Sequence, residues 1–443
     1  MSRTTQIFCV STLYGAATLA AAIESDCFAE ADRRLLLVFN NSATPETTPA
    51  VDEMQGFAPL RDHFDGVLSW NEAIHPFHPG AWSPRSDDIP LLERYLRLLW
   101  GLGDDAVELV LESIQVTPAL TVAQLFTGAP LHVYADGLMS YGPTRNKLDP
   151  LVGTRVRRLL HLDLVPGLAP MLLTEFDVPA HVVPTPAFRK VMSGLTDAVP
   201  DLPALPADAA LLLGQYLSAL NILSAAEEED LHVRMMRGAV ERGHRTIVFK
   251  PHPTAPARFS RALETEAEKL GVDLTVLDTP VLAEVLFEKA PPALVVGCFS
   301  TALFTASAFY DLPVARIGTE ALLDRLTPHQ NSNRIPAVLV DALLPDLEGK
   351  KGDDAVPADT LNGLVTAVGF TMQPQMHPGL RPAAERYLSQ HFGPRTQRYF
   401  KRKRLTSLGL PGGIPERLSF LPRNATARRV VRRARALTKS VRR

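Results

Sequence analysis

The chain has 443 residues, of which 46% are hydrophobic and 21% are charged, and its formal net charge is -2. This composition allows a large buried core divided among two or three domains, and the near-neutral charge gives no overall attraction to nucleic acid. The three cysteines, Cys9, Cys27 and Cys298, form no C-x-x-C pair, so they indicate neither a disulfide framework nor a zinc site and favour a reducing cytoplasm.

The first 25 residues allow two interpretations. Residues 7–23 are apolar and alanine-rich and follow Arg3, a pattern shared with signal peptides. We favour a strand over residues 6–12 and, after a break at Gly15, a helix to about residue 23. No uninterrupted apolar run reaches the roughly 18 to 20 residues that span a bilayer, so we expect a soluble protein that is at most peripheral to a membrane.

Short apolar runs alternate with longer amphipathic ones through the first part of the chain. Such alternation is typical of βα units and of a mostly parallel sheet. It predicts a first Rossmann-like lobe over residues 1–195. The predicted strands lie at 7–10, 35–39, 66–70, 107–111 and 131–134, and the predicted helices at 89–102 and 119–126.

A second alternating series follows a group of prolines between residues 179 and 206, which favour extended backbone and predict an inter-lobe linker. We expect a second, nucleotide-binding Rossmann-like lobe over 196–380, a helical segment over 381–422 and a basic tail over 423–443. Two such lobes with an interdomain cleft form a GT-B-like α/β architecture, in which ligands lie at the carboxyl ends of the strands. The second-lobe elements are strands at 209–213, 246–249, 274–277, 293–296 and 314–317, and helices at 227–242, 258–270, 281–288 and 301–309.

The tail is strongly basic and contains no acidic residue. As a helix it would interleave its charges with apolar residues, which suits binding to an anionic membrane surface. A solvated, disordered terminus is the alternative, and nucleic acid is disfavoured because no aromatic residues for base stacking accompany the charges. The basic residues are Arg423, Arg428, Arg429, Arg432, Arg433, Arg435, Lys439, Arg442 and Arg443.

His-Pro occurs four times, at His75, His78, His252 and His377, so the dipeptide alone carries little information. His252 differs from the others because it follows Lys250 just beyond a predicted buried strand, where open α/β sheets bind their ligands. Flanking prolines would hold its imidazole and the Lys250 ammonium toward the cleft, a pairing suited to a diphosphate or phosphodiester. The alternative is a structural histidine supported by its prolines.

Another predicted strand runs through Gly297 into hydroxyl residues at the start of a predicted helix. Ser300 or Thr301 would cap that helix by accepting hydrogen bonds from its free N–H groups. The same helix N-terminus has the dipole and the donors that bind phosphate, and capping is compatible with phosphate binding. Gly297, Ser300 and Thr301 are therefore candidate phosphate-binding residues, with a purely capping role as the alternative.

In the first lobe, the strand predicted at 131–134 is followed by Ala135, Asp136 and Gly137. A carboxylate that faces a phosphate site across a cleft suits the role of general base for an incoming hydroxyl, while an imidazole opposite assists the departing phosphate. Because Asp-Gly is also a common turn pair, an ordinary turn is the alternative.

Together these motifs resemble the bacterial sialyltransferases and polysialyltransferases of GT-B type. The shared marks are acidic residues before a glycine in the first lobe, His-Pro after a strand in the second, and a later Ser/Thr-rich loop, in that order. Gln215 at the end of Leu-Leu-Leu-Gly-Gln, and Glu284 after Thr279 and Pro280, also resemble that family's nucleotide-binding lobe. The resemblance covers roughly residues 5–375.

The resemblance implies inverting transfer of a sialic or related nonulosonic acid from a CMP-activated donor to a glycan hydroxyl. Asp136, in the first lobe on the acceptor side, would deprotonate the acceptor hydroxyl. His252, in the second lobe, would stabilise or protonate the departing phosphate. The resemblance also implies that no obligatory metal or other cofactor takes part, which is consistent with the absence of an Asp-x-Asp motif. The implied nucleotide-site residues are Ser300 and Thr301 at the phosphate, Glu284 at the ribose, and Gln215 and Lys250 along the nucleotide.

One departure from the family pattern leaves the activity open, because Ala135 stands where a first acidic residue is expected. Either Asp136 alone serves as base, or the chain is a weak or altered enzyme. A rival class is the CDP-glycerol or CDP-ribitol phosphotransferases of cell-wall polymer synthesis, whose Asp-Tyr-Ser-Ser setting is absent here. A non-catalytic nucleotide-sugar-binding protein is the third interpretation.

Overall fold

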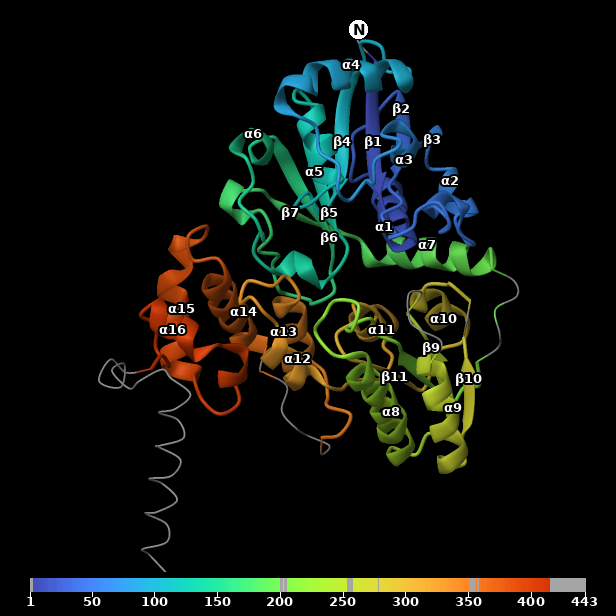
Figure 1. Cartoon of the computed structure of the whole chain (residues 1–443), viewed down its shortest axis with the longest axis vertical. Coiled ribbons are helices and arrows are strands. Elements are labelled where there is room, and N and C mark those ends of the chain that lie inside the picture. Colours follow the sequence, from blue (N-terminus) through green and yellow to red (C-terminus); the bar gives the residue numbers. More distant parts are fainter. Residues whose placement is uncertain are drawn as a thin grey trace, which may run out of the picture.

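The computed structural model describes residues 3–199, 202, 205–252, 258–277, 279–349, 356 and 358–414 (Figure 1). Two parallel sheets, each accompanied by helices, form an upper and a lower lobe, so the predicted two-lobed α/β architecture is confirmed. The predicted basic tail at 423–443 and residues 415–422 of the predicted helical segment lie outside the described residues.

The first lobe contains a seven-stranded parallel sheet in the order β3-β2-β1-β4-β5-β6-β7. Its first five strands match the predicted ones, and β6 and β7 extend the sheet beyond the predicted edge. Two arginines near the start of β6 interrupt its apolar pattern, and β7 is a short edge strand with mostly exposed side chains. The strands are β1 (Thr4–Val10), β2 (Arg33–Val38), β3 (Gly66–Ser69), β4 (Ala106–Glu112), β5 (Leu131–Ala135), β6 (Val156–Leu162) and β7 (Ala180–Val183).

Helix α1 (Leu13–Glu24) confirms the strand-then-helix interpretation of the N-terminal region, but the predicted break at Gly15 is wrong because the helix already begins at Leu13. The hydroxyl of Thr12 accepts a hydrogen bond from the Gly15 N–H at 2.9 Å and so caps the helix. Most of α1 is buried against the first-lobe core, which explains its apolar, alanine-rich sequence without a membrane. The other first-lobe helices are α2 (Ala58–Arg61), α3 (Trp70–Ala73), α4 (Ile89–Leu99), α5 (Ala119–Leu125) and α6 (Pro150–Gly153).

The linker predicted between residues 179 and 206 is wrong over most of its length, because β7 and helix α7 (Thr185–Asp197) occupy it. Pro184 precedes the helix and Pro186 lies in its first turn, where N–H groups have no partner within the helix and proline is tolerated. Helix α7 packs on α1 of the first lobe and on α10 (Ala283–Lys289) of the second, and it runs between the lobes (Figure 1). The lobes are therefore joined by a packed helix.

The second lobe contains a five-stranded parallel sheet in the order β10-β9-β8-β11-β12, and all five strands were predicted. Strands β8 and β11 are buried on both faces, which explains their continuous apolar runs. The strands are β8 (Ala210–Leu213), β9 (Thr246–Lys250), β10 (Asp273–Val276), β11 (Leu294–Gly297) and β12 (Val314–Arg316), and the helices between them include α8 (Ala225–Glu241), α9 (Arg258–Leu270) and α11 (Ala302–Tyr310).

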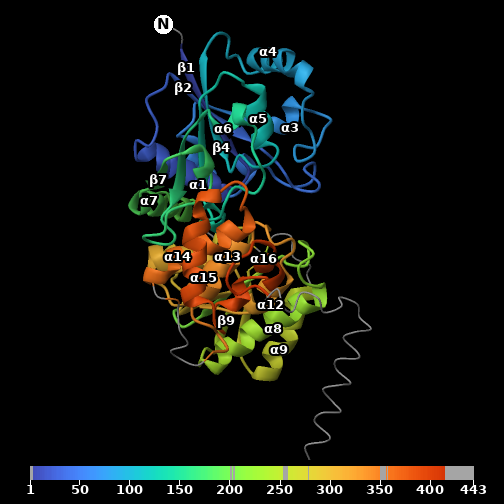
Figure 2. The same cartoon turned by 90° about the vertical axis from the view of Figure 1, so that its left-hand side faces the viewer.

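Further helices gather on one side of the second lobe, below the first (Figure 2). They are α12 (Thr319–Arg325), α13 (Arg334–Leu343), α14 (Ala358–Met372), α15 (Arg381–His391) and α16 (Arg402–Ser407). Helix α13 packs against the 3-10 turn Leu138–Tyr141 of the first lobe, so α7 and α13 both connect the lobes. No helix in the described part of the chain is both long enough and apolar enough to cross a bilayer.

Candidate active site

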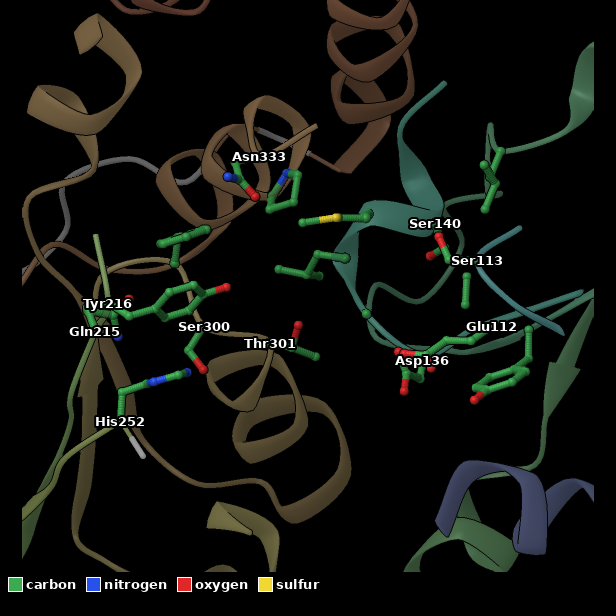
Figure 3. Close-up of a pocket in the computed structure, with 18 of the residues that line it drawn as sticks. Glu112, Ser113, Asp136, Ser140, Gln215, Tyr216, His252, Ser300, Thr301 and Asn333 are labelled. Carbon is green, nitrogen blue, oxygen red and sulfur yellow. The ribbon is translucent and has the colours of Figure 1, made fainter. Parts of the chain in front are cut away.

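A cleft of about 520 Å³ lies between the two lobes, at the carboxyl ends of strands from both sheets (Figure 3). Glu112 and Asp136 enter it from the ends of β4 and β5. From the second lobe, His252 follows β9, and Ser300 and Thr301 follow β11. Motifs from distant parts of the sequence thus meet at the carboxyl ends of the strands, where α/β folds bind ligands. Their positions directly after predicted strands had indicated this location.

Asp136 is partly buried in this cleft, and the charged side chain with the largest effect on it is another acid, Glu112. Burial raises the pKa of Asp136 from 3.8 to about 7, and the Glu112 carboxylate adds to the effect because two like charges disfavour joint ionisation. Burial also raises the pKa of Glu112, although the Ser11 N–H opposes this by donating to its Oε2 at 2.9 Å. A carboxylate whose pKa lies near neutrality is suited to proton abstraction.

Gly137 brings the two lobes close together next to Asp136. A methyl group placed at Gly137 would lie 3.3 Å from Oγ1 of Thr301, at the start of α11 in the other lobe. This separation is tighter than most side-chain contacts, so glycine permits the close approach of the two loops. The predicted Asp-Gly turn and the predicted hydroxyl loop therefore lie opposite each other across the cleft.

His252 is held where β8 and β9 end side by side. The Gly214 N–H donates to the Lys250 carbonyl at 2.8 Å, and a Cβ at Gly214 would lie only 2.8 Å from the His252 nitrogen. The Tyr216 ring packs on the imidazole with ring centroids 4.2 Å apart and an interplanar angle of 31°. Burial and the Lys250 ammonium both lower the pKa of His252, which favours the neutral imidazole.

Helix α8 supports the loop that carries Tyr216. The Gln215 N–H donates to Nε2 of His232 at 3.1 Å, and the carboxylate of Glu228 accepts from the N–H groups of Leu217 and Ser218 at 2.7 and 2.9 Å. Glu228 and His232 are both buried. The sequence analysis did not identify Glu228, His232 or Tyr216. For Glu228 and His232 the sequence offers one signal, because these polar residues lie four positions apart on the apolar face of a helix.

Of the two hydroxyl residues before α11, only Ser300 caps the helix, whereas both line the cleft. The Ser300 hydroxyl accepts from the Ala302 N–H at 3.2 Å and so caps the first turn of α11. Thr301 occupies the N-cap position without a side-chain capping bond. Both residues line the cleft, and α11 has nine residues, so its N-terminal dipole points a partial positive charge at this site.

The remaining predicted residues lie around the cleft, although only Gln215 is part of its described lining. The amide of Gln215 turns back and donates to the Leu213 carbonyl at 2.9 Å. Glu284 is buried and accepts from the Thr305 hydroxyl at 2.6 Å, and burial raises its pKa. Burial lowers the pKa of Lys250, and Glu284 opposes that shift.

Gly297 lies at the buried end of β11 and does not belong to the described lining of the cleft. A Cβ at this position would lie 3.3 to 3.5 Å from the side chain of Leu303, so the glycine allows α11 to pack closely against its own strand. In the described residues, no group of three or more His, Cys, Asp or Glu side chains is arranged to hold a metal ion. That the enzyme works without a metal stays a prediction.

A model of the alpha-2,8-polysialyltransferase family matches residues 6–319. The chain belongs to this family. Family membership confirms the resemblance to sialyltransferases and polysialyltransferases and the enzyme class, a glycosyltransferase. The matched region includes Asp136, His252 and Thr301, and therefore both sides of the cleft. A search of curated proteins returned no significant match.

Several solved structures are similar to this polysialyltransferase-family enzyme in overall chain course. A sialyltransferase GT-B domain from Photobacterium damselae has 11% identity and a TM-score of 0.39, over 76% of this chain and 96% of that one. MurG from Acinetobacter baumannii has 11% identity and a TM-score of 0.41, over 88% and 95%. UDP-GlcNAc 2-epimerase from Methanocaldococcus jannaschii has 13% identity and a TM-score of 0.45, over 71% and 83%.

Proposed function

We propose that this enzyme transfers a sialic or related nonulosonic acid from a CMP-activated donor to a glycan hydroxyl, with inversion and without a metal. One observation carries the proposal: a carboxylate with a near-neutral pKa, Asp136, and an imidazole, His252, line one cleft from opposite lobes. A base for the acceptor and an acid for the leaving phosphate need such an arrangement around the anomeric carbon.

In the proposed reaction, the Asp136 carboxylate takes the proton of the acceptor hydroxyl, and the acceptor oxygen forms a bond to the anomeric carbon. The bond from that carbon to the CMP phosphate oxygen breaks, and its electron pair leaves with CMP. His252 donates a proton or hydrogen bond to this oxygen. Burial lowers the pKa of this imidazole, but an anionic phosphate beside it would raise the pKa again and favour the protonated form.

The donor phosphate would bind at the start of α11. The hydroxyls of Ser300 and Thr301 and the helix N-terminus supply donors and positive potential there. Lys250 would add a positive charge behind His252, and Glu284 would bind the ribose. Gln215 lines the cleft but its amide already donates to backbone carbonyls, so we assign it a place along the nucleotide and no charge interaction.

We also propose a cytoplasmic location, with peripheral binding to an anionic membrane surface through the tail at 423–443. The tail lies outside the described residues, and its basic and apolar sequence alone supports this part of the proposal. The proposed substrates are a nucleotide-sugar donor and a glycan acceptor. Nucleic acid has no role in this proposal.

The test is a donor comparison with purified enzyme. CMP-sialic acid, CDP-glycerol and UDP-sugars are each supplied with a panel of glycan acceptors, and nucleotide release and product mass are measured. We expect turnover with CMP-nonulosonates only, and an Asp136→Asn, His252→Ala double variant supplies the blank. Turnover confined to CDP-glycerol would assign the phosphotransferase class instead, and binding without turnover of any donor would support the non-catalytic interpretation.

A further inference from the structure

The cleft holds a second carboxylate beside that of Asp136, on Glu112. Glu112 is the last residue of β4, and the parallel pairing of β4 with β5 sets it opposite Tyr134, two residues before Asp136. Glu112 and Asp136 thus reach the cleft from the ends of adjacent strands, and Figure 3 shows them next to each other.

The Glu112 carboxylate has a fixed position. Its Oε2 accepts the N–H of Ser11, the residue that follows β1, at 2.9 Å. Strand β1 lies directly beside β4 in the sheet, so the carboxylate is held at the ends of three neighbouring strands. A backbone N–H is a neutral partner, so it orients the carboxylate without cancelling its charge.

The titratable groups that interact electrostatically with Asp136 come from four elements. Glu112 of β4 and Glu284 of α10 act on it as negative charges, with Glu112 the stronger. The hydroxyls of Tyr14 on α1 and Tyr134 on β5 also lie close enough for Asp136 to raise their pKa values. Glu284 is partly balanced by Lys250. The Glu112 charge is therefore the main electrostatic influence on Asp136 that a single substitution can remove.

We propose that Glu112 is a positioning residue that acts on Asp136 through space, from the neighbouring strand of the same sheet. Its negative charge keeps Asp136 strong enough as a base to accept the acceptor proton at neutral pH. Because the two carboxylates repel each other, they hold one proton more readily between them than either would alone, and they titrate as a pair. This inference rests on the proposed function of the cleft, since it concerns the same proton transfer.

The test compares the pH dependence of kcat/KM in the wild type, Glu112→Gln and Glu108→Gln. Glutamine keeps an oxygen that accepts the Ser11 N–H but removes the charge. Glu108 is the matched control because it lies on the same strand, four residues and roughly 13 Å away from the cleft end, and it accepts from the Gln6 amide at 3.0 Å. A Glu112→Asp variant tests rescue by charge.

In the wild type, kcat/KM should rise with pH through about 7, as the base ionises. In Glu112→Gln we expect this rise to move down by about one pH unit and the plateau to fall about threefold, because a weaker base ionises earlier but abstracts less effectively. Glu108→Gln should match the wild type, and Glu112→Asp should restore part of the shift. A Glu112→Gln profile that superimposes on the wild-type profile after scaling would overturn the proposal.

A second measurement does not depend on turnover. Carboxyl-labelled aspartate is followed by carbon NMR during a pH titration, and the Asp136 signal is assigned by its loss in Asp136→Asn. We expect its midpoint to fall in Glu112→Gln and to stay in place in Glu108→Gln. A shifted midpoint without CMP-nonulosonate turnover would refute the proposed function and keep the carboxylate pair, whereas an unshifted midpoint in an active enzyme would refute the pair alone.

Discussion

The Tyr216 ring lies against the imidazole of His252, with the ring centroids 4.2 Å apart. Tyr216 and His252 follow the adjacent strands β8 and β9, and Gly214 allows the two strand ends to approach closely. The contact removes water from one face of the imidazole, and burial is the main cause of its lowered pKa. Tyr216 is therefore a positioning residue for the proposed leaving-group acid.

This contact predicts different effects for two substitutions of Tyr216. Tyr216→Phe keeps the ring and should change kcat/KM less than twofold. Tyr216→Ala removes it, and we expect a loss of about two- to tenfold, the size of one aromatic contact. In Tyr216→Ala the His252 pKa should also rise toward its usual value of 6.5, as NMR titration of the imidazole would measure. Equal kinetics in the two variants would contradict this role.

Substitutions of Asp136 and of His252 should differ in their effects on CMP binding and on turnover. Asp136→Asn should lower transfer by about 10² to 10⁴ and leave CMP affinity largely intact, because a base acts on the acceptor. His252→Ala should lower turnover strongly and also weaken CMP binding, because we propose that its imidazole contacts the CMP phosphate. Calorimetry with CMP and product analysis supply the two measurements. Near wild-type turnover in Asp136→Asn would show that the base is misassigned.

Gly214→Ala should disturb the His252 loop without touching a catalytic atom. A Cβ at this position would lie 2.8 Å from the His252 nitrogen and 2.9 Å from Cα of Pro251, both backbone atoms that cannot move aside cheaply. We expect CMP affinity to fall at least about tenfold and stability by about 1 to 3 kcal/mol.

Gly194→Ala is the control for that substitution. Gly194 lies in α7, and a Cβ there would meet nothing within 4 Å. Alanine is a better helix former than glycine, so stability should stay constant or rise by up to about 1 kcal/mol, with CMP affinity unchanged. Calorimetric unfolding and CMP titration compare the two variants. Equal effects of the two substitutions would contradict the inference that backbone atoms near Gly214 leave no room for a Cβ.

The raised pKa of Asp136 makes stability depend on pH. The folded state binds a proton with a pKa of about 7, whereas the unfolded chain releases it near 3.8, so Asp136 lowers stability as pH rises between these values. Asp136→Asn removes the ionisable group and should stabilise the protein by about 1 to 3 kcal/mol at pH 8, allowing for its partial exposure. At pH 4 the gain should nearly vanish. Chemical denaturation at both pH values measures the difference, and a pH-independent gain would contradict the linkage.

Removal of the basic tail at 423–443 should weaken sedimentation of the protein with anionic liposomes. The tail carries nine basic residues and no acidic one, so its attraction to an anionic surface should also decrease as salt is added. Neutral liposomes provide the control, and CMP-nonulosonate turnover in solution should survive the truncation. Unchanged liposome binding would rule out the tail as the membrane contact.

Sequence periodicity was sufficient for much of the fold and for the position of most site residues. Buried parallel strands are short apolar runs, and ligands lie at their carboxyl ends. Local patterns alone could therefore place Asp136 at the end of a first-lobe strand and His252 and Ser300 at the ends of second-lobe strands. The same reasoning failed for α7, because prolines at a helix start resemble those of a linker. It also missed β6, where arginines interrupt the apolar run.

The sequence by itself determined the two lobes, the strand ends and the hydroxyl loop, because those depend on residues that are neighbours along the chain. Only the tertiary structure decided which side chains meet there. Glu112 lies beside Asp136 because β4 pairs with β5, and Tyr216 lies on His252 because β8 pairs with β9. Strand pairing joins residues that are far apart in sequence, and no local pattern records which strands will be adjacent.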